Sequence, residues 1–283
     1  RSVVNELARF GSHFRKNMDL EEYLKQHDII GIQGVDTRFI TKLIRNEGCM
    51  NGLITTHHYE DLEEVLKRIR EYKVSGVVDQ TTCSKPYVLG QGKYKVALYD
   101  FGAKKNIARE LVKRDCEVTV FPAHTPAQTI LDGNFDGIML SNGPGDPAEC
   151  HEIIENVKIL SQSGIPIFAI CLGHQLMALA HGCETEKMTY GHHGANHPVK
   201  DLSTNRVYIS TQNHNYVVKE ESLDNQVAKM WFQNVNDGTL EGIEYLQKPI
   251  KTVQFHPEAC AGPTDTAYLF DEFIKMMGGN QNA

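Results

Sequence analysis

A run of apolar residues followed by a helical pattern marks the centre of the chain. Residues 165–170 are almost continuously apolar, which is typical of a parallel strand covered on both faces. Leucines then recur at helical spacing through residues 172–179, and Gly182 is the residue type that commonly follows a helix end. The pattern predicts a buried strand, a sharp turn at Cys171 and an amphipathic helix.

The same rhythm of strand, loop and helix begins about 70 residues earlier in the chain. Strands that alternate with helices of this length predict a parallel sheet with right-handed crossovers. The expected strands are residues 95–100, 117–121 and 136–141, with helices that end near residue 114 and span residues 149–162.

Beyond Gly182 the apolar runs become shorter and are separated by turn residues. This spacing favours a twisted, partly antiparallel sheet, followed by a helix over 264–277 and a disordered tail over 278–283. The expected strands are residues 206–210, 216–218, 228–232, 242–246 and 250–255.

The pattern of apolar residues in the first part of the chain predicts a smaller α/β unit. Periodicity is lost over residues 73–93, which contain several Gly and Pro, so we place the domain boundary there. The expected domains are residues 1–92, linker included, and 93–283. Within the first, we expect helices over 19–26, 37–48 and 59–72, the first two capped at Asp19 and at Asp36 or Thr37. Residues 29–32 form a short apolar stretch, and residues 52–56 are a candidate strand.

Composition restricts the function. The chain has 283 residues, of which 41% are hydrophobic and 23% are charged, so it is an ordinary globular sequence of about two domains. Its net charge of −7 argues against a nucleic-acid or anionic-membrane binder. Seven scattered cysteines form no disulfide framework and no paired metal motif, and no apolar run reaches transmembrane length. We therefore expect a cytoplasmic protein.

Cys171 is the first candidate for chemistry. Small residues flank it at Ala169 and Gly173, as a tight turn from strand to helix requires, and this is the nucleophile-elbow pattern with sulfur in place of oxygen. The start of a helix favours a thiolate over a thiol. The alternative is a buried and inert cysteine.

A thiol nucleophile needs a base and a group that orients the base. His256 and Glu258 follow an apolar strand, so they fall at the same edge of the sheet as Cys171, and two residues apart they can face one side. With thirteen histidines in the chain, a chance pair is the alternative.

The loop over residues 142–147 is rich in Gly and Pro and follows another expected strand. Gly143 there, together with the amide of Leu172, could present N–H groups to an oxyanion. A phosphate cradle is an alternative, although the loop lacks the lysine and hydroxyl of a Walker motif, and a plain turn is another. Because the carboxyl ends of the strands share one edge, residues 100–106, this loop and Cys171 are expected to line one site.

Three histidines close together, His192, His193 and His197, raise the question of a metal site, with Cys183 nearby. Their spacing matches no zinc motif, so no metal site is expected.

Several separated motifs resemble the class I, triad-type glutamine amidotransferases. They are Cys171-Leu-Gly-His-Gln175, Ser141-Asn-Gly-Pro-Gly-Asp-Pro147 and His256-Pro-Glu258. Further stretches resemble the family of small, glutaminase subunits of carbamoyl phosphate synthetase, so the resemblance covers nearly the whole chain. They are residues 35–38, 51–52, 99–107, 191–200 and 211–214.

The resemblance implies a fold and a set of roles. The fold is α/β, with a mostly parallel twisted sheet flanked by helices and a smaller, truncated N-terminal α/β domain. Cys171 would be the nucleophile, His256 the base and Glu258 the group that orients it, and Gly143 and Leu172 would form the oxyanion hole. Glutamine would be bound by Lys104, Gly143, Gly145, Leu172, Gln175, Asn213, Asn215 and Tyr216.

The resemblance also implies a partner. Ammonia would pass to a large synthetase subunit, which combines it with bicarbonate and ATP, so ATP, Mg²⁺ and bicarbonate are expected there and no cofactor is expected in this chain. The alternatives are a glutaminase that serves another synthase and a non-catalytic docking or regulatory subunit.

Two positions depart from the family pattern. Ala169 and Asn215 stand where glycine is usual. Asparagine is the residue other than glycine that best accepts a positive φ, so we expect Asn215 to fit the same backbone. The family's first domain is also longer, and its upstream part carries a serine of the glutamine pocket.

Overall fold

The computed structural model describes residues 2–14, 16–260 and 262–279, and the chain divides into two compact units, residues 1–73 and 74–283. The division lies earlier than the expected boundary at residue 92. Residues 74–92 belong to the second unit because Val78 is buried in its core and strand β3 (Tyr87–Leu89) joins its sheet. Of the expected disordered tail, residues 278 and 279 end a helix and residues 280–283 lie outside the described part.

The first unit has short elements and little buried surface. Asp36 caps its second helix by accepting a hydrogen bond from the Phe39 N–H at 2.9 Å, as expected, whereas Asp19 caps nothing and pairs with Lys16. The strand expected over residues 52–56 does not form, since that segment pairs with no other strand among the described residues. The elements are β1 (Ser2–Val3), α1 (Leu20–Gln26), β2 (Gly31–Ile32), α2 (Thr37–Glu47) and α3 (Leu62–Glu71).

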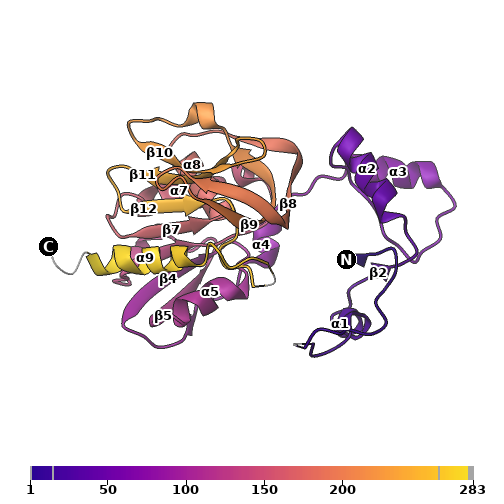
Figure 1. Ribbon diagram of the computed structural model, residues 1–283, viewed down its shortest axis with the longest axis horizontal. Coiled ribbons are helices and arrows are strands. Elements are labelled where there is room, and N and C mark those ends of the chain that lie inside the picture. The colour runs from indigo at the N-terminus through magenta and orange to yellow at the C-terminus, as the bar shows by residue number, and fades with distance from the viewer. Residues whose placement is uncertain (1, 15, 261, 280–283) are drawn as a thin grey trace. The chain divides into compact units, whose positions relative to one another are not determined.

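A ten-stranded sheet forms the centre of the second unit (Figure 1). The neighbours β5, β4, β6, β7 and β12 are parallel, and the remaining strands pair antiparallel at the two sides, so the sheet is mixed. In spatial order the strands are β3, β5 (Cys116–Pro122), β4 (Tyr94–Asp100), β6 (Gly137–Leu140), β7 (Ile167–Ile170), β12 (Ile250–Val253), β11 (Leu240–Tyr245), β10 (Ala228–Asn234), β8 (Thr185–Asp201) and β9 (Val207–Val218).

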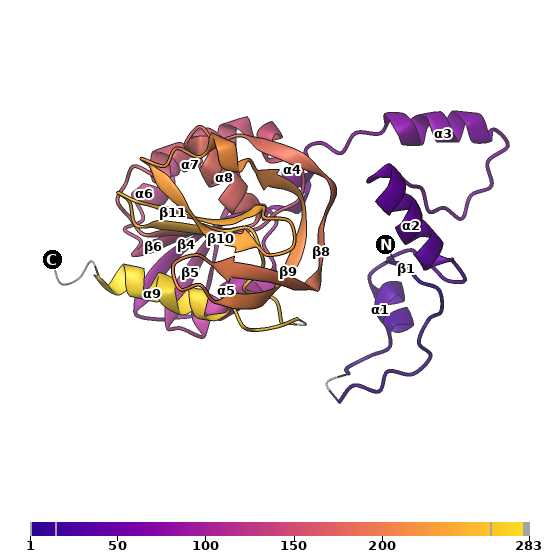
Figure 2. The same ribbon diagram turned by 45° about the horizontal axis from the view of Figure 1, so that its top comes forward.

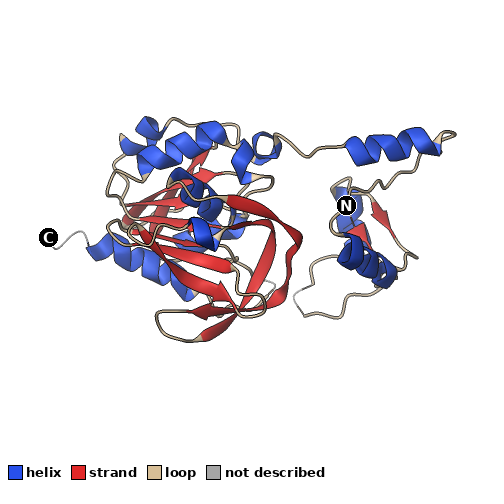
Figure 3. Cartoon of the chain, turned by 90° about the horizontal axis from the view of Figure 1, so that it is seen from above, coloured by secondary structure: helices blue, strands red, loops and turns tan. Residues whose placement is uncertain are grey.

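Helices cover both faces of this sheet (Figures 2 and 3). One core packs α6 (Ala127–Leu131), α7 (His151–Leu160) and α8 (Leu172–Ala180) against it, and the other packs α5 (Lys105–Val112) and α9 (Tyr268–Gly279). Among the described residues, no helix combines the length and the apolar character needed to cross a membrane. The expected α/β fold is confirmed.

The expected strand, turn and helix at the centre of the chain are β7, Cys171 and α8. Gly182 has φ 84°, and the N–H groups of Gly182 and Cys183 donate to the carbonyls of Leu179 and Ala178, each at 3.0 Å. These bonds satisfy carbonyls that the helix end leaves free. Gly182 therefore ends α8 as the sequence predicted.

Candidate active site

Four neighbouring parallel strands bring their carboxyl ends to one edge of the sheet. The spatial order β4, β6, β7, β12 places the segments that follow these strands side by side, namely residues 101–106, 141–147, 171 and 254–258. Such an edge is the usual ligand-binding position in open α/β sheets. The structure confirms that these segments, expected to line one site, lie together.

Cys171 occupies a strained turn between β7 and α8. Its φ of 53° and ψ of −105° are rare for a residue with a side chain, and its N–H donates to the Val253 carbonyl at 2.8 Å. A Cβ atom on Gly173 would lie 2.6 Å from the Leu140 carbonyl oxygen, so the turn needs glycine there. The turn holds the sulfur at the start of α8, where the helix dipole favours negative charge.

His256 and Glu258 form a buried pair. Nδ1 of His256 lies 2.7 Å from Oε1 of Glu258, and both side chains are almost fully buried. The amine of Lys104 lies 3.4 Å from the same oxygen, and the Asn106 side chain donates to the Glu258 carbonyl. Glu258 therefore fixes the ring of His256, while Nε2 has no hydrogen-bond partner within the described protein.

The charges at the site favour a protonated His256. Burial alone would lower the pKa of His256, but the neighbouring Cys171 sulfur and the Glu258 carboxylate outweigh it and raise that pKa to about 9. Burial alone would raise the pKa of Glu258, but the hydrogen bond and charge of His256, aided by Lys104, lower it. At neutral pH the site therefore holds an imidazolium between a carboxylate and a sulfur.

The loop after β6 is held tightly against the loop after β4. The Ser141 hydroxyl accepts from the Phe101 N–H at 2.9 Å, and the Asn142 side chain accepts from the Lys104 N–H at 2.9 Å. A Cβ atom on Gly143 would overlap the Phe101 carbonyl and lie 2.6 Å from a methyl carbon of Leu172. Only glycine fits there, so the backbone of the loop approaches the first turn of α8 closely.

A cavity of about 410 Å³ joins these groups. Cys171 and His256 line it. Glu258, which pairs with His256, and Leu172 are not among the lining residues. Of the residues predicted to bind glutamine, the cavity is lined by Lys104, Gly143, Gly145, Gln175, Asn213, Asn215 and Tyr216.

Several residues around the cavity were not predicted. Thr81 lines it from α4 (Val77–Thr81), inside the segment expected to be a linker, and His214 lines it from β9. Asn215 lies in β9 and has no positive φ, contrary to the expectation from the glycine usual there. Its Oδ1 lies 3.1 Å from Nε2 of His193, whose Nδ1 lies 3.0 Å from Asn213 Oδ1. No local sequence signal marks these cross-strand contacts.

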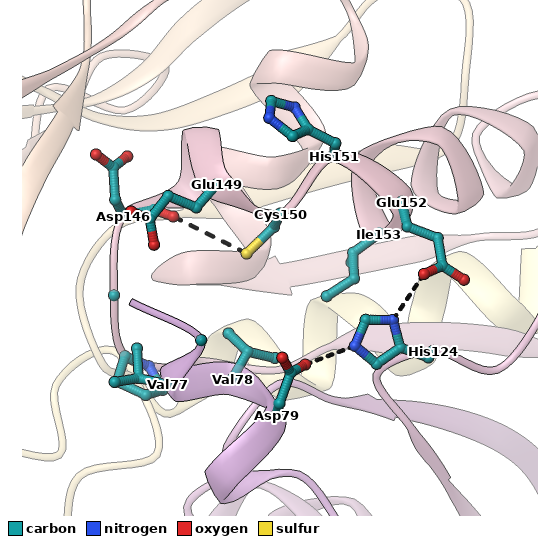
Figure 4. A pocket seen from close by; sticks show the side chains of 13 residues that line it. Val77, Val78, Asp79, His124, Asp146, Glu149, Cys150, His151, Glu152 and Ile153 are labelled. Atoms are coloured by element: carbon teal, nitrogen blue, oxygen red, sulfur yellow. Dashed lines mark hydrogen bonds and ion pairs between the residues drawn. The ribbon is translucent and has the colours of Figure 1, made fainter. Parts of the chain in front are cut away.

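A second, smaller cavity of about 240 Å³ lies beside the loop after β6 (Figure 4). His124 bridges Asp79 and Glu152 across it, with ring nitrogens 2.6 and 3.0 Å from the two carboxylates. The Cys150 thiol also lines it, and burial raises the pKa of that thiol to about 11. Cys150 is therefore protonated at neutral pH, which argues against a second nucleophile here.

Groups that can hold a metal ion meet in the antiparallel part of the sheet, and one of them, His214, also lines the active-site cavity. They are His192, His214 and Glu241, all buried, with ligand atoms within 4.8 Å of one another. No metal site was expected from the sequence, because the spacing considered there included only His192 of these three.

The chain belongs to the class I glutamine amidotransferases. The family model described as "Glutamine amidotransferase class-I" matches residues 97–276. A crystallised Thermoplasma acidophilum protein, whose description names part of a GMP synthase, shares the fold with a TM-score of 0.59 and 20% identity, covering 66% of this chain and 96% of its own.

Relatives specify the family further. The model "Carbamoyl-phosphate synthase small chain, CPSase domain" matches residues 2–54. The carbamoyl phosphate synthase small chain of Listeria monocytogenes is 47% identical over 99% of this chain and 77% of its own length, and that of Clostridium perfringens is 44% identical over 96% and 77%. The chain belongs to the family of carbamoyl phosphate synthase small chains, the glutamine amidotransferase subunits of that enzyme.

Proposed function

We propose that this chain hydrolyses glutamine through a thioester on Cys171 and supplies the ammonia to a large synthase chain that makes carbamoyl phosphate. One observation carries the proposal: Cys171 stands at a strained strand-to-helix turn beside a buried His256 that is paired with Glu258, and Cys171 and His256 line the same cavity.

The first half of the reaction makes the thioester. The Cys171 sulfur attacks the side-chain amide carbon of glutamine, and the carbon–nitrogen bond breaks as His256 gives its proton to the leaving ammonia. The negative charge on the amide oxygen is stabilised by the N–H groups of Leu172 and Gly143. Leu172 is the first residue of α8, so its N–H has no partner within the helix.

The second half releases glutamate. The neutral His256 takes a proton from a water molecule, whose oxygen attacks the thioester carbon and displaces the Cys171 sulfur. The proton stays on His256 and the sulfur leaves as a thiolate. The protonated His256 and the free Cys171 sulfur are thereby restored for the next turnover. Glu258 keeps Nδ1 protonated throughout, so Nε2 is the nitrogen that exchanges protons.

The remaining cavity residues bind the substrate. The amide nitrogen of Gln175 donates to the Tyr216 carbonyl and to the Gln254 side chain, both at 2.8 Å, so its oxygen is left to accept from the amine of glutamine. Lys104, Gly145, Asn213, Asn215 and Tyr216 surround the same cavity and complete the contacts.

The name of the family implies a larger partner chain. The match of residues 2–54 to the small-chain model supports carbamoyl phosphate synthesis over another ammonia-consuming synthase. ATP, Mg²⁺ and bicarbonate would then bind on the large chain, because glutamine hydrolysis through a thioester uses none of them.

The test is glutamate release from glutamine, measured with and without a carbamoyl phosphate synthase large chain. We expect release that rises when the large chain is added and disappears in Cys171→Ala. Release that survives in Cys171→Ala contradicts the thioester mechanism. Release that never responds to the large chain contradicts the proposed partner.

A further inference from the structure

Three buried side chains converge in the antiparallel part of the sheet. His192 lies on β8, His214 on β9 and Glu241 on β11, and they are 7%, 5% and 0% exposed. Their nitrogen and oxygen atoms lie within 4.8 Å of one another. Because they come from three strands, the cluster depends on the tertiary fold.

The hydrogen bonds of the two histidines determine which nitrogen carries the proton. Nε2 of His192 lies 2.7 Å from the Asp237 carboxylate, and Nδ1 of His214 lies 2.8 Å from the Tyr216 carbonyl. Both partners only accept hydrogen bonds, so these two nitrogens are the donors. The opposite nitrogens, Nδ1 of His192 and Nε2 of His214, are buried without a hydrogen-bond partner in the described part of the chain.

One of these two nitrogens lies within ion-pair distance of a carboxylate. Nδ1 of His192 is 3.2 Å from Oε1 of Glu241. Glu241 receives hydrogen bonds from neutral amides, those of Gln212 at 2.8 Å and Asn234 at 3.0 Å. A fully buried carboxylate that faces nitrogen lone pairs is costly unless a positive charge lies between them.

A proton on Nδ1 of His192 would balance only part of the cluster. It would join His192 to Glu241 but leave Nε2 of His214 buried and unpaired. One divalent ion bonded to all three groups satisfies each of them.

We propose that His192, His214 and Glu241 bind a zinc ion. Two imidazole nitrogens and one carboxylate oxygen are a ligand set that zinc accepts. A histidine that binds zinc commonly donates a hydrogen bond from its other ring nitrogen to a carboxylate, as His192 does to Asp237. The ion would join β8, β9 and β11. It would thereby brace the stretch of β9 that carries Asn213, Asn215 and Tyr216 to the cavity of the active site.

The test is equilibrium dialysis of the whole chain against Zn²⁺, followed by metal analysis. We expect one zinc per chain at this site, and affinity at least about tenfold weaker in Glu241→Gln and in His192→Gln, since even loss of an outer partner costs that much. The control is His193→Gln, a neighbouring exposed histidine on the same strand, which should bind zinc as the unchanged chain does.

Cobalt distinguishes this site from the Cys171 thiol. With Co²⁺ in place of zinc, the unchanged chain should show visible absorption of a nitrogen and oxygen site, without the near-ultraviolet charge-transfer band of a thiolate ligand, and Cys171→Ala should give the same spectrum. This measurement needs no variant of the cluster. The proposal is overturned if the chain binds no zinc, if both cluster variants bind it unchanged, or if the bound cobalt has a thiolate ligand.

Discussion

The amine of Lys104 lies 3.4 Å from the Oε1 atom of Glu258, the same oxygen that pairs with His256 at 2.7 Å. Lys104 therefore acts on the triad as well as lining the cavity. Its positive charge favours the ionised carboxylate, which in turn favours the protonated imidazole.

Replacing Lys104 by Met should lower kcat/KM for glutamine hydrolysis by about fivefold, since a partly exposed ion pair contributes only about 1 kcal/mol. Lys105→Met is the matched control, because Lys105 is exposed and is not among the residues that line the cavity. Equal kinetics in the two variants would show that Lys104 has no role in the site.

The rate should fall as the solution becomes alkaline. The pKa of His256 is raised to about 9, so the imidazolium that protonates ammonia is present below that pH and is lost as pH rises through it. A profile of kcat/KM should show this descending limb near pH 9. Glu258→Gln removes a carboxylate that raises this pKa and should move the limb to lower pH. A descending limb at the same pH in Glu258→Gln would show that the limb does not report the ionisation of His256.

Gly143→Ala should reduce kcat by about a hundredfold, the typical effect of losing one oxyanion-hole donor. The added methyl group would overlap the Phe101 carbonyl and displace the loop. Gly278→Ala, whose Cβ would meet Tyr94 at an ordinary 3.4 Å, should leave kcat unchanged. A fully active Gly143→Ala protein would argue that this loop does not form the oxyanion hole.

Phe168→Ala should destabilise the second unit by about 3–5 kcal/mol. Phe168 is 1% exposed on β7, with ring centres 6.2 and 6.0 Å from those of Phe270 and Phe273 on α9. Urea unfolding measures the loss, and Ile159→Ala, at a half-exposed position, should cost far less. A small loss at Phe168 would mean that α9 contributes little to this core.

The central part of the site was predictable because its signals are local. The apolar strand before Cys171, the small residues around it and the Gly182 helix end are each encoded within a few positions. The position of His256 and Glu258 at a strand end was enough to place them at the edge that carries Cys171. The resemblance implied that Glu258 orients His256, and the structure places the two side chains 2.7 Å apart.

Other features depend on contacts between distant residues. Strand β8 was missed because residues 185–201 are rich in His and Gly and do not alternate, and it is defined instead by pairing with β9 and β10. Residues 52–56 have the apolar pattern of a strand but no partner strand in the described part of the chain. Residues 74–92 contain Gly and Pro, as a linker does. They nevertheless belong to the second unit, where the Thr82 hydroxyl donates a hydrogen bond to the Asp100 carbonyl at 2.6 Å.

The central claim is that a covalent glutamyl thioester forms on Cys171. Acid quenching during turnover of glutamine, followed by mass spectrometry of the peptide that contains Cys171, tests it directly. The account predicts a glutamyl group on that sulfur, with no adduct and no glutamate release in Cys171→Ala. Steady glutamate release without any adduct, unchanged in Cys171→Ala, would contradict it.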